Sequence, residues 1–270
     1  MIAPPAPTFI PMRIISFNAN GIRAAARKGF FDWLAGQDAD VVAIQELKAQ
    51  QHQLEPDPVF WPEGYHCAYH EATARKGYSG VALYARREPD EVIRGMGEPE
   101  FDGEGRYIEA RFGDLAVASL YAPSGSSGDH RQASKERWLE YFPEFLQRRR
   151  DANGELIVCG DWNIAHTEKD IRNWKSNQKN SGFLPHERAW LDRLFGEQGF
   201  VDGFRVVDDR PDRYTWWSNR GQAWAKNVGW RIDYQVITPG LAEQVKGADI
   251  FQAERLSDHA PLIMDYDWPF

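Results

Sequence analysis

Acidic and amide side chains follow several short apolar runs of this chain, at positions where strands would end. Glu46 follows one such run, and Asp161 and Asn163 follow another. Because alternate residues of an extended chain point to the same side, Asp161 and Asn163 would share a face. Each motif alone also fits a structural role, either a solvated acid at a strand end or an Asx turn. Whether these residues can form a catalytic or metal-binding site therefore depends on whether the fold brings them close together.

Two further motifs combine an acid with a histidine. Asp233 lies inside the strand-like run 231–237, where an unpaired charge would be costly, so it needs a cation or a hydrogen-bond donor. His259 follows Asp258 at the start of the last apolar run, and alone it also fits a structural histidine. A carboxylate that holds a histidine in one tautomer makes it useful for catalysis. Asp233 could be that carboxylate.

Convergence of these strand ends would bring carboxylates together. Two like charges 4 Å apart repel by about 4 kcal/mol at an effective dielectric constant of 20. A divalent cation would relieve that repulsion, and oxygen ligands from Glu, Asp and Asn suit Mg²⁺ or Mn²⁺. A structural zinc site is disfavoured because the set has no cysteine and at most one histidine. The sequence thus predicts phosphoryl chemistry assisted by a hard cation.

The elements that would position these side chains are mostly short strands. Their β-branched and aromatic content predicts strands at Arg13–Phe17, Val41–Gln45, Gly80–Ala85, Arg106–Phe112, Leu115–Tyr121, Leu156–Cys159, Tyr214–Trp217, Arg231–Ile237 and Ala260–Tyr266. Helices are predicted over Gly29–Gln37, Gln132–Arg150 and His186–Gln198, with a kink at Pro143 in the second. Two sheets packed face to face, with helices outside, would bury this many strands in one domain.

Composition narrows the class of protein. The 270 residues are 42% hydrophobic and 27% charged, as in a globular protein, and the net charge is −8. A nucleic-acid partner would therefore need a local basic patch or cations. Cys67 and Cys159 exclude a disulfide framework, which favours the cytoplasm, and neither a membrane span nor a signal peptide is expected. Residues 1–11 are expected to form a proline-rich tail before a single domain over 12–270.

Six blocks in a fixed order make the sequence recognisable. They are Ser16–Arg23, Gln45–Lys48, Ser119–Pro123, Gly160–Asn163, Trp230–Asp233 and Ser257–Pro261. Together they resemble the exonuclease III family of abasic-site (AP) endonucleases, in the endonuclease/exonuclease/phosphatase superfamily. The resemblance implies an α/β fold, a four-layer α/β/β/α sandwich of two mainly antiparallel sheets flanked by helices. It also implies a monomer that uses Mg²⁺, with Mn²⁺ as a substitute, on double-stranded DNA. The expected reactions are incision 5′ to abasic sites and removal of 3′-terminal nucleotides or 3′-blocking groups.

The resemblance assigns metal ligands to three of the motifs. Glu46 would be the principal Mg²⁺ ligand, with Asn18 and Asp258 completing or flanking the metal site. If a second metal binds, its implied ligands are Asp161, Asn163 and His259.

The resemblance also assigns the catalytic groups. Asp161 would orient or deprotonate the attacking water, and Asn163 would hold that water or the phosphate oxygens. His259, oriented by Asp233, would bind the scissile phosphate. Tyr121 would contact the phosphate or help the leaving group. How Asp161, His259 and Tyr121 divide proton transfer stays open at this level.

DNA contacts are implied by two segments. The positions of Trp216, Trp230 and Ile232 match a family pocket for a flipped-out sugar without a base. The segment 210–231 holds five basic residues and one acid, and it supplies Arg220 as a further candidate. A polar loop places Asn177, Asn180 and Ser181 at family positions close to the abasic nucleotide. The tryptophans also fit core positions, and the loop also fits an ordinary polar loop.

Two departures from the family pattern stand out. Asn20 occupies a position where animal relatives have Asp, which would weaken a second metal contact. The loop Ser124–Gly128 lacks the arginine that some relatives insert into DNA, which would weaken the grip on the product strand.

Two alternative functions remain. The segment from Trp230 to Gln235 and the ending Asp265–Trp268 also resemble the catabolite repression control protein, a nucleic-acid-binding regulator whose catalytic acids are altered. Other phosphodiesterases of the same fold share the acidic framework but lack the block at Trp230–Asp233. The retained Glu46, Asp161 and Asn163 favour the nuclease, because a binding protein has no chemical use for them.

Overall fold

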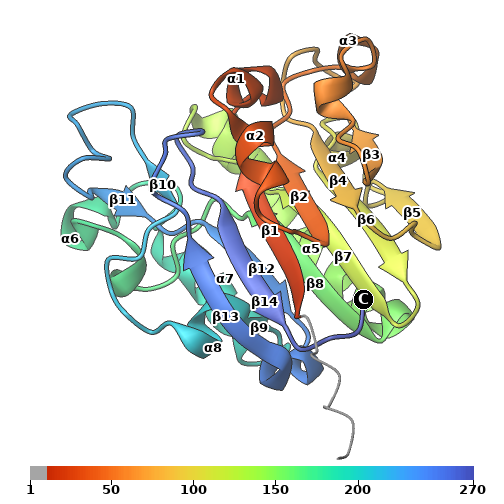
Figure 1. Cartoon of the computed structure of the whole chain (residues 1–270). Helices are drawn as coiled ribbons and strands as arrows, with labels where there is room; N and C mark the ends of the chain where they lie inside the picture. The colour runs from red at the N-terminus through yellow and green to blue at the C-terminus, as the bar shows by residue number, and fades with distance from the viewer. Residues whose placement is uncertain (1–10) are drawn as a thin grey trace, which may run out of the picture.

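The predicted apolar runs form two six-stranded sheets in the computed structural model, which describes residues 11–270 (Figure 1). The predicted tail, apart from Pro11, lies outside the described residues. The first sheet consists of β1 (Met12–Asn18), β2 (Val41–Gln45), β3 (His66–His70), β4 (Val81–Ala85), β13 (Val245–Ile250) and β14 (Leu262–Tyr266), in the order β13-β14-β1-β2-β4-β3. The second consists of β5 (Glu91–Arg94), β6 (Tyr107–Phe112), β7 (Leu115–Tyr121), β8 (Glu155–Asp161), β9 (Val201–Asp202) and β12 (Asp233–Ile237), in the order β5-β6-β7-β8-β12-β9. A separate ribbon pairs β10 (Trp216–Trp217) with β11 (Gly229–Trp230).

Each sheet contains one parallel pair among antiparallel ones. β1 runs parallel to β2, and β7 runs parallel to β8. The carboxyl ends of parallel strands meet at one edge, so Asn18 pairs with Gln45 and Tyr121 pairs with Asp161 at the strand ends. The sheets are mainly antiparallel, as predicted, and the two parallel pairs bring the motif residues to the edge.

Helices cover the outer faces of both sheets. The α-helices are α1 (Ile22–Arg27), α2 (Phe30–Ala35), α3 (Gln51–Leu54), α4 (Pro99–Asp102), α5 (Asp129–Asn153), α6 (Trp174–Asn177), α7 (Pro185–Phe195) and α8 (Gly203–Val207), and 3₁₀ turns cover Pro58–Phe60, Glu168–Asp170 and Pro239–Gln244. Side chains of α1 and α2 join the outer core of the first sheet, and those of α5 and α7 join the outer core of the second. A third core lies between the sheets. The predicted four-layer α/β/β/α sandwich is confirmed.

Alternation within the central strands explains why they were easy to predict. In β8, Ile157 and Cys159 face the other sheet, whereas Leu156 and Val158 face α5 and α7. A strand buried on both faces is a nearly continuous apolar run. The strands that the sequence did not predict are β3, β5, β9, β11 and β13. Four of these are the edges of the two sheets, where one side of the strand meets solvent and polar residues interrupt the apolar pattern.

Helix α5 continues across Pro143 instead of ending there. A proline has no N–H group to donate to the carbonyl four residues earlier, which here belongs to Leu139. The indole Nε1 of Trp190, on α7, donates to that carbonyl at 2.8 Å. The contact between the two helices thus satisfies the acceptor that Pro143 leaves free.

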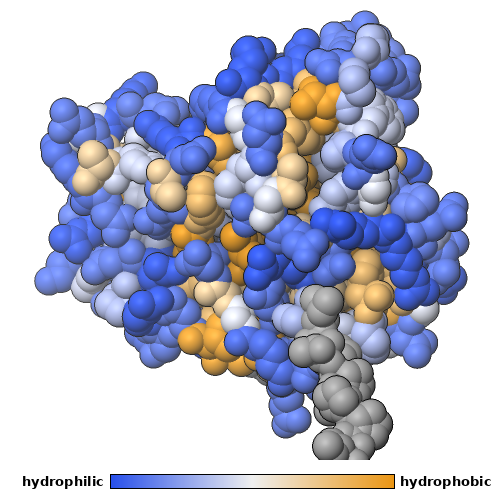
Figure 2. All heavy atoms as spheres, viewed as in Figure 1, coloured by the Kyte–Doolittle hydropathy of each residue, from blue (hydrophilic) through white to orange (hydrophobic). Residues whose placement is uncertain are grey.

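The surface seen in Figure 2 is mostly hydrophilic, with apolar side chains showing in small areas between polar ones. Over residues 11–270, no helix combines the length and the apolar character needed to cross a membrane.

Candidate active site

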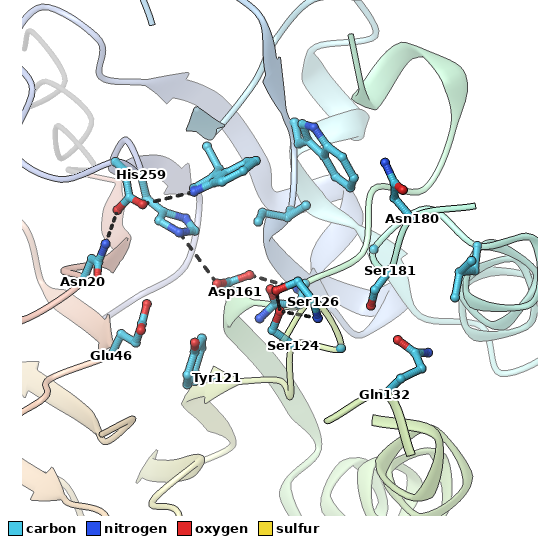
Figure 3. Close-up of a pocket in the computed structure, with 18 of the residues that line it drawn as sticks. Asn20, Glu46, Tyr121, Ser124, Ser126, Gln132, Asp161, Asn180, Ser181 and His259 are labelled. Carbon is cyan, nitrogen blue, oxygen red and sulfur yellow. Dashed lines mark hydrogen bonds and ion pairs between the residues drawn. The ribbon is translucent and has the colours of Figure 1, made fainter. Parts of the chain in front are cut away.

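A cleft of ≈ 790 Å³ opens at the edge where both parallel strand pairs end. In Figure 3, Glu46, Tyr121 and His259 lie on one side of it, Asn180, Ser181 and Gln132 lie on the other, and Asp161 lies between them. The predicted site residues that line it are Glu46, Tyr121, Asp161, Asn163, Asn180, Ser181, Trp216, Trp230, Ile232, Asp258 and His259. Asn18, Asp233, Asn177 and Arg220 do not line it.

Asp161 is the buried carboxylate at the end of β8. It accepts a hydrogen bond from Asn18 Nδ2 at 2.9 Å and one from the backbone N–H of Asn163 at 2.9 Å. One of its oxygens lies 3.8 Å from His259 Nε2. Asn18 is fully buried, and its own Oδ1 accepts the backbone N–H of Asn20. Both amide atoms of Asn18 are thus engaged in the network that orients Asp161.

His259 is held from behind by Asp233. Its Nδ1 lies 2.9 and 3.1 Å from the two carboxylate oxygens of Asp233, which is the first residue of β12. A hydrogen bond from Nδ1–H to this carboxylate leaves Nε2 directed toward Asp161. The antiparallel pairing of β12 with β8 sets Asp233 opposite Asp161, which explains how residues 72 positions apart share one site.

Burial and charge shift the pKa values of this group. Burial raises the pKa of Asp161, and the neighbouring Asp233 raises it further, to about 8. Burial alone would lower the pKa of His259, but the carboxylates of Asp233, Asp161 and Asp258 outweigh it and raise the pKa to about 10. The imidazole is therefore cationic at neutral pH, beside a carboxyl group that binds protons more tightly than usual.

Glu46 and Asp258 are two further carboxylates that line the cleft. Glu46 pairs with Lys48 at 2.9 Å, and Lys48 also contacts Asn20 Oδ1. Asn20 donates through Nδ2 to Asp258 at 2.8 Å, and Trp216 Nε1 donates to the other Asp258 oxygen at 3.2 Å. An aspartate in place of Asn20 could not make that donation.

Four non-glycine residues that line the cleft have left-handed backbones. The φ angles are 43° at Asn20, 56° at Glu46, 50° at Lys48 and 53° at Asn163. Such conformations cost on the order of 1–3 kcal/mol each and persist only where surrounding contacts enforce them. Four of the ten non-glycine residues with positive φ among residues 11–270 thus follow the ends of β1, β2 and β8, where they line the cleft.

The donor set fits a divalent cation. Asp161, Asp233 and His259 each offer one ligand atom, and these atoms lie within 4.8 Å of one another. Glu46 and Asp258 add two further carboxylates that line the cleft. Five ionisable groups with mostly oxygen donors suit a hard cation, and neither Cys67 nor Cys159 is among the residues that line the cleft. Such an ion would replace the Lys48 ammonium as the counter-charge of Glu46.

Tyr121 ends β7 beside a buried arginine. Arg106 donates to the Tyr121 carbonyl at 2.8 Å, and its guanidinium lies 5.0 Å from the centre of the Tyr121 ring. Burial raises the pKa of Tyr121 well above its usual value, and the charges of Glu46 and Asp161 add to that effect. The phenol therefore stays neutral and can donate a hydrogen bond into the cleft.

The aromatic wall separates into site and core members. Trp216 and Trp230 line the cleft with their ring centres 6.0 Å apart, edge to face, because β10 pairs with β11. The neighbouring Trp217, by contrast, is buried and packs on Trp224 in the core between the sheets, so these two rings have a structural role. Asn177 donates instead to backbone carbonyls of its own turn, and Arg220 is exposed beyond the lining.

Several lining residues were not singled out from the sequence. They are Lys48, Ser124, Ser126, Gln132, Lys179 and Leu184. Lys48 had a usable signal, because it follows Glu46 by two positions in the same motif. Gln132 had no such signal. The local sequence of a long helix does not show that its first turn lies beside strand ends distant in the chain.

The fold and the cleft together define a phosphoesterase of the α/β sandwich type. The sequence model of the Endonuclease/Exonuclease/phosphatase family matches residues 15–259, so the chain belongs to this family. It is 41% identical over 257 residues to the exodeoxyribonuclease of Bacillus subtilis, covering 93% of this chain and 98% of that protein.

Two further relatives have similar coverage. The chain is 38% identical to the DNA repair nuclease APEX1 of Danio rerio, covering 94% of this chain and 81% of the relative. An AP endonuclease from Archaeoglobus fulgidus has the same fold, with a TM-score of 0.86, 29% identity, and coverage of 95% and 100%. The predicted family and the prediction of a nuclease are confirmed.

Proposed function

We propose that this protein is a Mg²⁺-dependent DNA phosphodiesterase of base-excision repair. Its leading reaction is incision 5′ to an abasic site, which leaves a 3′-hydroxyl. Removal of 3′-terminal nucleotides or 3′-blocking groups uses the same residues, because both reactions break a phosphorus–oxygen bond and leave a 3′-hydroxyl. The observation that carries the proposal is the single cleft that joins Asp161 and His259 to the aromatic pair Trp216 and Trp230.

Asp161 is the proposed base for the attacking water. In its ionised form, a carboxylate with a raised pKa accepts a proton more readily than an ordinary one, and hydrogen bonds from Asn18 and Asn163 keep it in one orientation. The water oxygen would attack phosphorus while the bond to the 3′ oxygen breaks. Asn163 is proposed to hold the water or a phosphate oxygen from the adjacent position.

His259 is the proposed electrostatic partner of the phosphate. Its cationic ring, fixed by Asp233, would offset the negative charge that grows on the phosphoryl oxygens. The neutral phenol of Tyr121 would donate to the phosphate or to the leaving oxygen. Both donors are held before substrate arrives, so little reorganisation is needed during the reaction.

Glu46, with Asp258 beside it, is the proposed holder of Mg²⁺, and Mn²⁺ is the proposed substitute. Asn18, whose two amide atoms are engaged with Asp161 and Asn20, is proposed to flank the metal site from behind the cleft. When bound, such an ion neutralises phosphate charge and polarises the phosphorus–oxygen bond. The carboxylates and amides of the cleft favour a hard cation of this kind. Asp161, Asn163 and His259 are the proposed ligands if a second ion binds.

The proposed substrate is double-stranded DNA with an abasic site or a 3′ end. Trp216, Trp230 and Ile232 would wall a pocket for the sugar, and flipping costs least where the base is missing. Asn180 and Ser181 lie on the opposite side of the cleft, and Asn177 and Arg220 would contact the flanking strand. A monomer in the cytoplasm is also part of the proposal, and the free thiols Cys67 and Cys159 are consistent with that compartment.

The comparisons and the complete acidic set favour this nuclease over a binding-only regulator of the catabolite repression control type. The test uses a 5′-labelled duplex with one tetrahydrofuran abasic analogue, an intact duplex, and either Mg²⁺ or EDTA. A single Mg²⁺-dependent cut at the analogue is the expected result. A ladder from the 3′ ends without that cut would make the protein chiefly an exonuclease. No cleavage of either duplex would support the regulator.

A further inference from the structure

A fully buried ion pair lies directly behind the cleft. Lys135 on α5 and Glu187 on α7 are 2.7 Å apart, and both side chains are 0% exposed. Neither was assigned a role from the sequence. Replacing such a pair by apolar groups of similar size is often neutral for stability, so its presence alone is no argument for stabilisation. The groups that hydrogen-bond to Lys135 and Glu187 indicate the role of the pair better.

Lys135 reaches the catalytic side of the cleft. Its Nζ donates to the backbone carbonyl of Asn163 at 2.9 Å. Asn163 has a left-handed backbone, and its N–H donates to Asp161. The ammonium therefore holds the carbonyl of the same residue whose N–H orients the proposed base, so both peptide groups that flank the Asn163 Cα are fixed.

Glu187 reaches the opposite wall. Its Oε2 accepts the backbone N–H of Gly182 at 2.7 Å and that of Leu184 at 3.1 Å. Its Oε1 lies 3.4 Å from Ser181 Oγ and 3.4 Å from Gln132 Nε2. One carboxylate thus contacts both the turn Ser181–Leu184 and the first turn of α5. Ser181, Gly182, Leu184 and Gln132 all line the cleft.

The two walls meet at Gly182. This residue has a φ of 93°, and a Cβ built on it would lie 3.0 Å from the ring of Trp230 and 3.1 Å from the Asn163 carbonyl. The turn is therefore packed between the aromatic wall and the Asn163 peptide with no spare room. A shift of the turn would change both the width of the sugar pocket and the orientation of Asp161.

We propose that Lys135 and Glu187 are positioning residues that set the distance between the aromatic pocket and the hydrolytic group, and so the preference for an abasic nucleotide over an ordinary 3′-terminal one. The proposal rests on the proposed function. In this proposal, the turn at Ser181–Gly182, packed against Trp230, limits the space at the aromatic pocket to a sugar without a base. Loosening it would admit a nucleotide that carries one, at the cost of alignment at Asp161.

The test compares two double variants, each of which removes one ion pair formed by a residue of α5. Lys135→Met/Glu187→Leu removes the buried pair and its hydrogen bonds while keeping similar volume. The control, Arg149→Met/Glu109→Leu, removes the pair joined at 2.6 Å about four turns further along α5, about 21 Å from Lys135. For both we would measure Tm, and kcat and KM on the analogue duplex and on the 3′ end of an intact duplex.

We expect Lys135→Met/Glu187→Leu to lower kcat/KM on the analogue by about 10²-fold, as misplacement by 1 Å can do. Activity on the intact 3′ end should fall less, so the ratio of the two activities changes. The control variant Arg149→Met/Glu109→Leu should leave that ratio unaltered, even if its Tm is lower than that of the wild-type protein. Assays run well below both Tm values separate positioning from stability.

Two results would overturn the inference: a folded Lys135→Met/Glu187→Leu variant with the wild-type ratio, or an equal change in the control. If that variant does not fold, Glu187→Gln, nearly identical in shape, gives the same readout. An inactive wild-type protein would instead refute the proposed function, so the two failures are distinguishable.

Discussion

At the scale of single residues, the cleft is organised around one carboxyl group that is held from three sides. Asn18 and the Asn163 backbone donate to Asp161, and His259 faces it at 3.8 Å. Removing its charge while keeping its shape is therefore a clean test of its role.

Asp161→Asn should abolish cleavage of the analogue duplex while binding to that duplex survives, because the amide cannot accept a proton from water. Cleavage by gel assay and affinity by fluorescence anisotropy would be measured on the same preparation. Retained turnover would remove Asp161 from the mechanism.

His259→Ala should lower kcat by about 10²–10³-fold, the usual contribution of one preorganised donor to a developing charge. The Asp233 carboxylate would then be buried without its partner, so Tm should be checked alongside the kinetics. A change confined to KM would contradict a role in the transition state.

The same two residues predict how stability depends on pH in the metal-free protein. The folded state raises the pKa of Asp161 from 3.8 to about 8 and that of His259 from 6.5 to about 10. Both groups then bind protons more tightly when folded, so stability falls as pH rises through this range. Thermal unfolding in EDTA should show Tm decreasing from pH 6 to 10, less steeply in Asp161→Asn. Equal slopes would mean that these shifts are absent.

At the scale of elements, the strand ends decide which side chains can meet. The central strands were predictable because burial on both faces leaves an apolar run. The edge strands β3, β5, β9 and β13 were not predictable. Each pairs with a neighbouring strand on one side and meets solvent on the other, so polar residues are tolerated and interrupt the apolar pattern. The helix Gln132–Arg150 was placed correctly, but its passage through Pro143 depends on Trp190 of another helix, which no local pattern indicates.

Trp190→Phe should destabilise the protein by about 1–3 kcal/mol, because it leaves the Leu139 carbonyl buried without a donor. Pro143→Ala would restore the helical donor and should reduce that loss, as a double-mutant cycle in urea would measure. Trp138→Phe is the matched control, since its buried Nε1 has no partner among the described residues. Equal losses for both tryptophans would show that ring packing, not the hydrogen bond, matters.

At the scale of the whole molecule, an acidic chain must bind an acidic polymer. The net charge of −8 repels DNA, so binding depends on basic side chains near the cleft and on cations. Lys179 lines the cleft and is exposed, whereas Lys246 lies at the start of β13, at the far end of its sheet, paired with Asp267.

Affinity for the analogue duplex, measured with Asp161→Asn, should fall with salt by about 0.9 log units per log unit for each phosphate contacted. Lys179→Ala should reduce that slope by about one contact, and Lys246→Ala should leave it unchanged. A flat salt response of the parent protein would argue against a basic DNA-binding surface.

The amino-acid sequence by itself determined the family, the two-sheet sandwich and the acidic motifs at strand ends, because buried strands and ordered motif blocks leave local patterns. Only the tertiary structure decided which motif residues face the cleft. It buries Asn18 and Asp233 behind Asp161 and His259, and turns Trp217 into the core while Trp216 lines the site. It also joins Lys135 to Glu187 across two helices. Strand register and helix contacts set these distances between residues far apart in the chain, so no local pattern contains them.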